Sequence, residues 1–172
     1  KAQYFLEVTK DVRIHMLTHR RYEKDFFLNI GKPEKQKKYL KKFDKVSSIM
    51  QEALDELQDM ATQHDAMGDK ERQTASRLPA LYDAYRSNFY SVVKAVQKDT
   101  GITPQQANKL MTPFKKSTYE LEDGVKLIAK AASDDLHAKA GAAVNRAQDN
   151  AVFILILMVA GLGIGLFAAV FI

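Results

Sequence analysis

The sequence predicts an all-α fold: an antiparallel up-down-up-down four-helix bundle whose fourth helix continues into a C-terminal transmembrane helix. Three observations predict it. Apolar residues recur at alternating spacings of three and four, which is the pattern of helices that pack along a seam. Glycine and proline interrupt this pattern at 31–33, at 68 and at 101–104. The final 22 residues, 151–172, contain no charged, amide or hydroxyl side chain.

The first two predicted helices are joined by a short turn. We expect the first helix over residues 1–30 and the second over 33–67. Gly31 suits the position after a helix end and Pro33 suits the first position of the next helix. The expected seam of the first helix is Phe5, Val8, Val12, His15, His19, Tyr22, Phe26 and Asn29. The expected seam of the second helix is Phe43, Val46, Met50, Ala53, Leu57, Met60, His64 and Met67.

The third predicted helix follows the break at Gly68 and ends near Thr100. Pro79 either kinks this helix or marks its first turn, because proline lacks an N–H and clashes with the preceding helical turn. The expected seam of this helix is Leu78, Tyr82, Tyr85, Phe89, Val92 and Val96.

The fourth predicted helix has a strong start signal. Thr103 suits the N-cap, Pro104 the first helical position, and Gln106 closes a capping box. Pro113 could kink the helix, but we expect it to run unbroken from Gln105 into the membrane. Its expected seam is Ala107, Leu110, Phe114, Ser117, Leu121 and Ile128.

These helices predict two parts of the chain. Short connections make neighbouring helices antiparallel, so residues 1–150 are expected to form the bundle. A helix over residues 151–172 would reach roughly 33 Å, enough to cross a bilayer core of about 30 Å. The fourth helix exceeds the other three, which leaves residues 134–150 without a partner. We therefore expect a fragment of a longer protein, in which 151–172 is the second of two spans.

Composition excludes several classes of function. The net charge is +5. Cysteine is absent, and its absence excludes disulfides and thiol nucleophiles. No nucleophile, base and orienting group can be placed in one pocket, so we expect no enzyme and no cofactor. His15 and His19, four residues apart, are weak metal candidates. No third ligand lies at their level on the same helix, and we expect no metal site.

One run of the first helix carries a resemblance to a known family. Residues 20–28 read RRYEKDFFL. This resembles the R-R-x-E-K-D-F-L run in the first sensor helix of bacterial methyl-accepting chemotaxis proteins with four-helix or helical-bimodular ligand-binding domains. Phe27 stands where leucine is usual. The resemblance implies a homodimer in the inner membrane, with a periplasmic domain that binds an organic acid or amino acid and signals by displacement of its last helix.

The same run admits two interpretations of its charges. They could pair with one another along the helix, at spacings of three and four. Alternatively, one arginine holds a ligand carboxylate, for which its planar, two-pronged donor is suited. Antiparallel packing would bring residues of the third and fourth helices to the same level. The candidate ligand-binding residues are Arg20, Arg21, Tyr85, Arg86, Phe89, Thr112 and Lys115.

Other functions stay open at this point. A transmembrane histidine kinase can use the same sensor bundle, and a tail-anchored, syntaxin-like interaction protein also ends in a span. Lysines cluster at 32–45, at the outer turn, where a periplasmic binding protein could dock. We expect no nucleic-acid partner, because no aromatic interleaving or binding motif accompanies these lysines.

Overall fold

The computed structural model describes residues 2–65, 67–99 and 101–171, and the side chains of residues 3–65, 67–99, 101–155 and 157. The regular structure in these ranges is helical throughout, and they contain no strand. The elements are α1 (Ala2–Leu28), α2 (Pro33–Gln63), α3 (Asp69–Lys98), α4 (Pro104–Leu110), the 3₁₀ helix η1 (Thr112–Phe114) and α5 (Lys115–Phe171). The predicted all-α class is confirmed.

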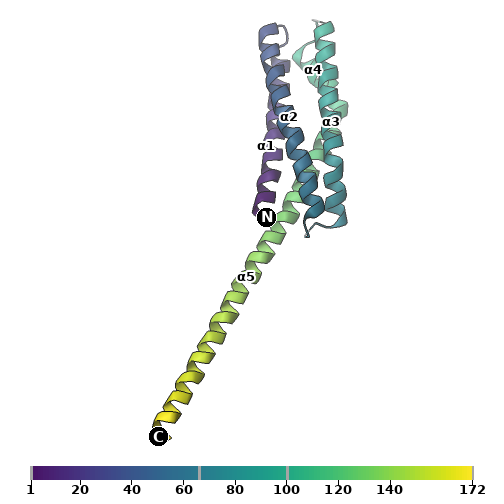
Figure 1. The fold of residues 1–172 in the computed structure, drawn as a ribbon. Helices are drawn as coiled ribbons and strands as arrows, with labels where there is room; N and C mark the ends of the chain where they lie inside the picture. The colour runs from purple at the N-terminus through teal and green to yellow at the C-terminus, as the bar shows by residue number, and fades with distance from the viewer. Residues whose placement is uncertain (1, 66, 100, 172) are drawn as a thin grey trace. The chain divides into compact units, whose positions relative to one another are not determined.

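The chain divides into two compact units, Lys1–Ser133 and Asp134–Ile172. In the first unit, α1, α2, α3 and the beginning of α5 lie side by side, and the short α4 precedes α5 (Figure 1). The apolar faces of these helices share one core. The second unit consists of the remainder of α5, and its described side chains from residue 137 onward are exposed.

The predicted seam of α3 lies at the centre of the core. All six of its expected residues are buried. Phe89 stacks on Phe43 of α2 with ring centroids 4.1 Å apart, and Phe26 of α1 meets Phe89 edge-on at 5.7 Å. The seam prediction for the fourth helix was wrong at Leu110, whose side chain is 44% exposed. Leu121 and Ile128 of that seam are buried as predicted.

Three hydrogen-bonded polar side chains, those of His19, Ser47 and Tyr82, lie within this core. The buried His19 donates from Nδ1 to the carbonyl of His15 at 3.0 Å. Its Nε2 accepts from the Tyr82 hydroxyl at 3.0 Å and lies 3.1 Å from Oγ of Ser47. Ser47 in turn donates to the carbonyl of Phe43. Both ring nitrogens of His19 are therefore engaged within the protein.

The predicted turn chemistry is confirmed at two connections. Gly31 has φ +83°, a left-handed conformation that favours glycine, and Pro33 opens α2. Thr103 caps α4: its Oγ1 accepts from the Gln106 N–H at 3.3 Å, and the Gln106 side chain accepts from the Thr103 N–H at 2.8 Å. This capping box satisfies backbone donors that have no partner inside the helix.

The prediction of one unbroken helix from Gln105 onward was wrong. α4 ends at Leu110, η1 covers Thr112–Phe114, and α5 begins at Lys115. Pro113 lies at the centre of the 3₁₀ turn, where its missing N–H and its ring disfavour a continuous α-helix. The helix that carries residues 151–171 therefore begins ten residues later than predicted.

Pro79 has the opposite outcome, because it lies inside α3. That helix begins at Asp69, so Pro79 does not mark its first turn. The other alternative, a kink at Pro79 within the helix, stays a prediction.

Gly124 on α5 allows a close approach to α3. A Cβ atom added there would lie 2.7 Å from Cδ2 of Leu78 and 3.0 Å from Cγ2 of Thr74. We expect Gly124→Val to lower the free energy of unfolding by about 1–3 kcal/mol, because the new side chain would overpack this contact. Urea denaturation of the full chain in detergent, followed by circular dichroism, measures the change.

Gly141 provides the matched control for this substitution. It lies in the same helix, and an added Cβ would have no atom within 4 Å. Gly141→Val should therefore leave the stability unchanged or slightly increase it, since valine has a higher helix propensity than glycine. Equal effects of the two substitutions would contradict a packing role for Gly124.

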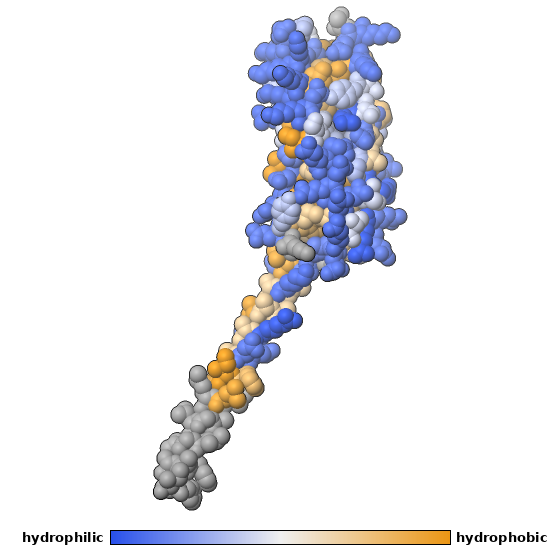
Figure 2. Space-filling view, in the orientation of Figure 1, coloured by the Kyte–Doolittle hydropathy of each residue, from blue (hydrophilic) through white to orange (hydrophobic). Residues whose placement is uncertain are grey.

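Among the described residues, no helix offers a stretch that is long and apolar enough to cross a membrane. The predicted span, 151–172, lies mostly outside the described side chains, so it stays a prediction. Val152, Phe153 and Leu155, at its beginning, are exposed. Figure 2 shows hydrophobic residues where the described part of the second unit ends, and mainly hydrophilic residues on the visible face of the first unit.

Candidate ligand-binding site

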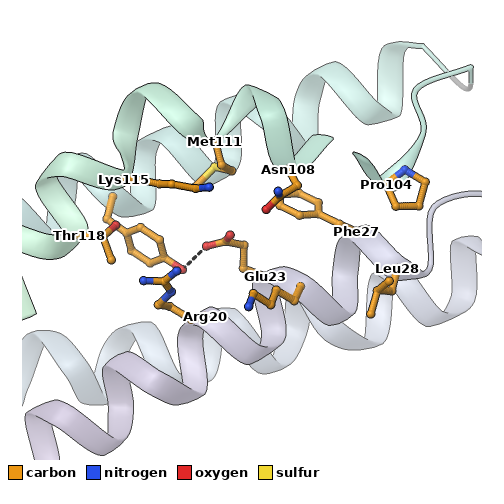
Figure 3. Close-up of a pocket in the computed structure, with 11 residues that line it drawn as sticks. Arg20, Glu23, Phe27, Leu28, Pro104, Asn108, Met111, Lys115 and Thr118 are labelled. Atoms are coloured by element: carbon orange, nitrogen blue, oxygen red, sulfur yellow. Dashed lines mark hydrogen bonds between the residues drawn. The ribbon is translucent and has the colours of Figure 1, made fainter. Parts of the chain in front are cut away.

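A cavity of about 390 Å³ lies within the first unit. Its walls come from α1, α3, α4 and the start of α5, together with Met111, the residue that precedes η1 in the sequence (Figure 3). The residues that line it are Arg20, Glu23, Lys24, Phe27, Leu28, Tyr85, Pro104, Asn108, Met111, Lys115 and Thr118. Helices far apart in the sequence thus contribute to one cavity.

Three of the predicted ligand-binding residues line this cavity. They are Arg20 on α1, Tyr85 on α3 and Lys115 on α5. Arg20 is partly buried, and its Nη1 donates to Oε1 of Glu122 at 3.2 Å. No ion pair joins Lys115 to a carboxylate in the described part of the chain. Of the two predicted cations that line the cavity, Arg20 and Lys115, it is therefore Lys115 that has no ion-pair partner among the described residues.

The other predicted cations point elsewhere. The Arg21 side chain is 79% exposed, and its Nε lies 3.9 Å from Oδ2 of Asp25. Arg86 pairs with Asp83 at 3.1 Å on the surface of α3 and stacks over the ring of Tyr82. For Arg21, the structure has the pairing along the helix that the sequence left as an alternative for the charges of residues 20–28.

The remaining two predicted residues also lie outside the cavity. Phe89 is buried in the aromatic core, where it contacts Phe27 at 6.0 Å between ring centroids. Since Phe27 lines the cavity, Phe89 supports that wall from behind. Thr112 is exposed, and its hydroxyl donates to the backbone carbonyl of Asn108 at 3.5 Å.

Glu23 is the cavity residue that sequence reasoning missed. Its side chain is only 6% exposed, and its Oε2 accepts a 2.7 Å hydrogen bond from the Tyr85 hydroxyl, drawn as the dashed line in Figure 3. Burial raises the pKa of this carboxyl above its usual value. The Tyr85 hydrogen bond and the charges of Arg20, Lys24 and Lys115 act in the opposite direction.

A periodic signal for Glu23 does exist in the sequence. Thr9, Met16 and Glu23 are spaced by seven residues, and all three are buried. The predicted seam contained instead the residues one position earlier, His15 and Tyr22, and these are only half-buried. A straight α-helix has 3.6 residues per turn, so its buried face drifts relative to a strict seven-residue repeat. The position of Glu23, seven residues after Met16 on the same face of the helix, was the signal that could have identified it.

The cavity combines the groups that orient a small polar molecule. Arg20, Lys24 and Lys115 supply positive charge, while Asn108 supplies an amide. Phe27 and Met111 add apolar surface. A few convergent polar groups on an apolar wall are typical of small-molecule sites. This arrangement can bind and orient a ligand.

The histidines lie in a different environment. No group of three or more metal-ligating side chains occurs among the residues that the structure describes. Burial lowers the pKa of His19 to about 4, which keeps its ring neutral near neutral pH. Its two nitrogens bond within the core, as described above, so we assign no ligand to it.

Comparison of this chain with known protein families, with characterised proteins and with solved structures gives no match.

Proposed function

We propose that residues 1–150 form the periplasmic sensory domain of a bacterial transmembrane chemoreceptor, an up-down-up-down bundle that acts as a homodimer. Residues 151–172 cross the inner membrane. The domain binds a small molecule through an anionic group, and a displacement of α5 transmits the signal. The resemblance of residues 20–28 to the first sensor helix of methyl-accepting chemotaxis proteins supports this family.

The observation that carries the proposal is the cavity between α1, α3 and α5. Arg20 and Lys24 approach it from α1, and Lys115 approaches it as the first residue of α5. An anion held between these cations would favour one arrangement of the two helices over another. Differential affinity for two arrangements is what a ligand needs to shift a conformational equilibrium. The helix so displaced also contains the proposed span.

The proposal predicts that cavity cations determine binding. Calorimetric titration of the full chain in detergent would use L-alanine, L-aspartate, L-glutamate, propionate, succinate and glutarate. For any of these that binds, Arg20→Gln and Lys115→Gln should each weaken the affinity about tenfold or more. The reason is that hydrogen bonds to a charged group contribute about 1.5–3 kcal/mol.

Arg21→Gln is the matched control, because Arg21 is the adjacent arginine and lies outside the cavity. It should leave the affinity within about twofold, the range expected for an exposed pair. Binding that survives the combined Arg20→Gln and Lys115→Gln substitutions would overturn the assignment of the site. Absence of binding by every compound would overturn it as well.

A further inference from the structure

The Glu23 carboxylate has acceptor capacity that the protein does not use. An ionised carboxylate has about four lone-pair positions for hydrogen bonds. In the described part of the chain, Glu23 receives one hydrogen bond, from Tyr85 to Oε2. Figure 3 shows the carboxylate pointing into the cavity. A buried charge with so few partners is costly, so a donor entering the cavity would find a favourable position beside it.

The three cavity cations do not neutralise Glu23 directly. No ion pair within 4.0 Å joins Glu23 to Arg20, Lys24 or Lys115, all of which the structure describes. Arg20 is instead bonded to Glu122. The cavity therefore presents one negative pole and several positive ones, separated by more than an ion-pair distance.

We propose that the ligand of this cavity carries a protonated amine as well as a carboxylate, and that Glu23 binds the amine. Lys115 and Arg20 then face the ligand carboxylate. This inference rests on the proposed function, since it names the class of molecule that the same site binds. A dicarboxylate without an amine is disfavoured, because one of its charges would have to lie near the buried Glu23 carboxylate. Glu23 is thus the residue that selects zwitterions over plain acids.

The titration of Glu23 gives the inference a second consequence. The titratable groups around Glu23 are Arg20 and Lys24 on α1, Tyr85 on α3 and Lys115 on α5. Burial raises the pKa of Glu23, and an ammonium group beside it would lower that pKa again. At a pH where the Glu23 carboxyl is partly protonated, zwitterion binding should therefore release protons from it. A plain acid bound in the same place would raise the pKa of Glu23 further and cause proton uptake.

The test compares pairs of ligands that differ by one amine. The pairs are L-alanine with propionate, L-aspartate with succinate, and L-glutamate with glutarate. In the full chain, at least one zwitterion should bind about tenfold or more tightly than its paired acid. Glu23→Gln, which keeps an oxygen acceptor for Tyr85, should weaken the zwitterion and strengthen the paired acid. A role in folding alone would move both affinities in the same direction.

The outcomes separate this inference from the proposed function. If no amino acid binds more tightly than its paired acid, or if Glu23→Gln leaves the ratio of their affinities unchanged, the zwitterion inference fails while the cation-dependent site stands. If no compound binds, both fail. Calorimetry in two buffers of different ionisation enthalpy reports proton release or uptake, and uptake on binding of the zwitterion would also overturn the inference. Tyr85→Phe keeps the carboxylate and should retain the preference for the zwitterion.

Discussion

Phe89→Ala is expected to lower the free energy of unfolding by about 3–5 kcal/mol, the largest effect of any substitution considered for this chain. The Phe89 side chain is fully buried, stacks on Phe43 at 4.1 Å and meets Phe26 edge-on at 5.7 Å. Truncation to alanine would remove these contacts from three helices at once and leave a cavity that the surrounding side chains fill only in part. Urea denaturation of the full chain in detergent, followed by circular dichroism, provides the measurement.

Leu17→Ala is the control for this experiment. Leu17 lies on α1 and is 63% exposed, so its truncation should change the stability by less than about 0.5 kcal/mol. Similar losses for the two substitutions would show that the aromatic core does not dominate the stability. Phe89→Leu should fall between the two, because it retains most of the apolar volume.

The same substitution has a consequence for the cavity. Phe89 contacts Phe27, and Phe27 forms part of the cavity wall on α1. Phe89 therefore does not line the cavity itself; it packs against Phe27, which does.

Local signals allowed most of the fold to be predicted. The α3 seam, from Leu78 to Val96, is fully buried because its apolar residues keep one face of the helix. Thr103 and Gln106 form the capping box because the required side chains lie three residues apart. Pro113 was the point of failure: a proline can kink or interrupt a helix, and only the packing around it determines which occurs.

The site was predicted less completely, for a geometric reason. Arg20, Tyr85 and Lys115 line the cavity, whereas Arg86 and Phe89 do not. Which face of a helix meets its neighbour depends on its rotation and on the register between helices, and a difference of one residue turns a side chain by about 100°. Sequence distance from a turn gives the level along the bundle but not this rotation.

Acidification is expected to destabilise the first unit through His19. The unfolded pKa of histidine is about 6.5, and burial lowers the folded pKa of His19 to about 4. Between these values the unfolded chain binds a proton that the folded chain does not, so the stability falls as the pH is lowered through this window. The full loss is about 3 kcal/mol, is reached near pH 4 and is absent above about pH 6.5.

The measurement is the difference in the free energy of unfolding between the native chain and His19→Gln, followed from pH 7 to pH 4. Glu23 titrates with the opposite sign, because a raised folded pKa adds stability at low pH that is lost as the pH rises. Since Glu23 is present in both chains, its contribution cancels in the difference. The exposed His137 provides the control: His137→Gln should retain the acid-dependent loss.

A difference between the native chain and His19→Gln that stays constant from pH 7 to pH 4 would contradict a neutral, buried His19. The geometry argues against that outcome. Nδ1 of His19 already donates to the His15 carbonyl, so an added proton must go to Nε2, which now accepts from Tyr82. The charge would then lie in the aromatic core between Phe43 and Tyr82, where no carboxylate among the described side chains is bonded to the ring. The cost of burying that charge is what the pH dependence measures.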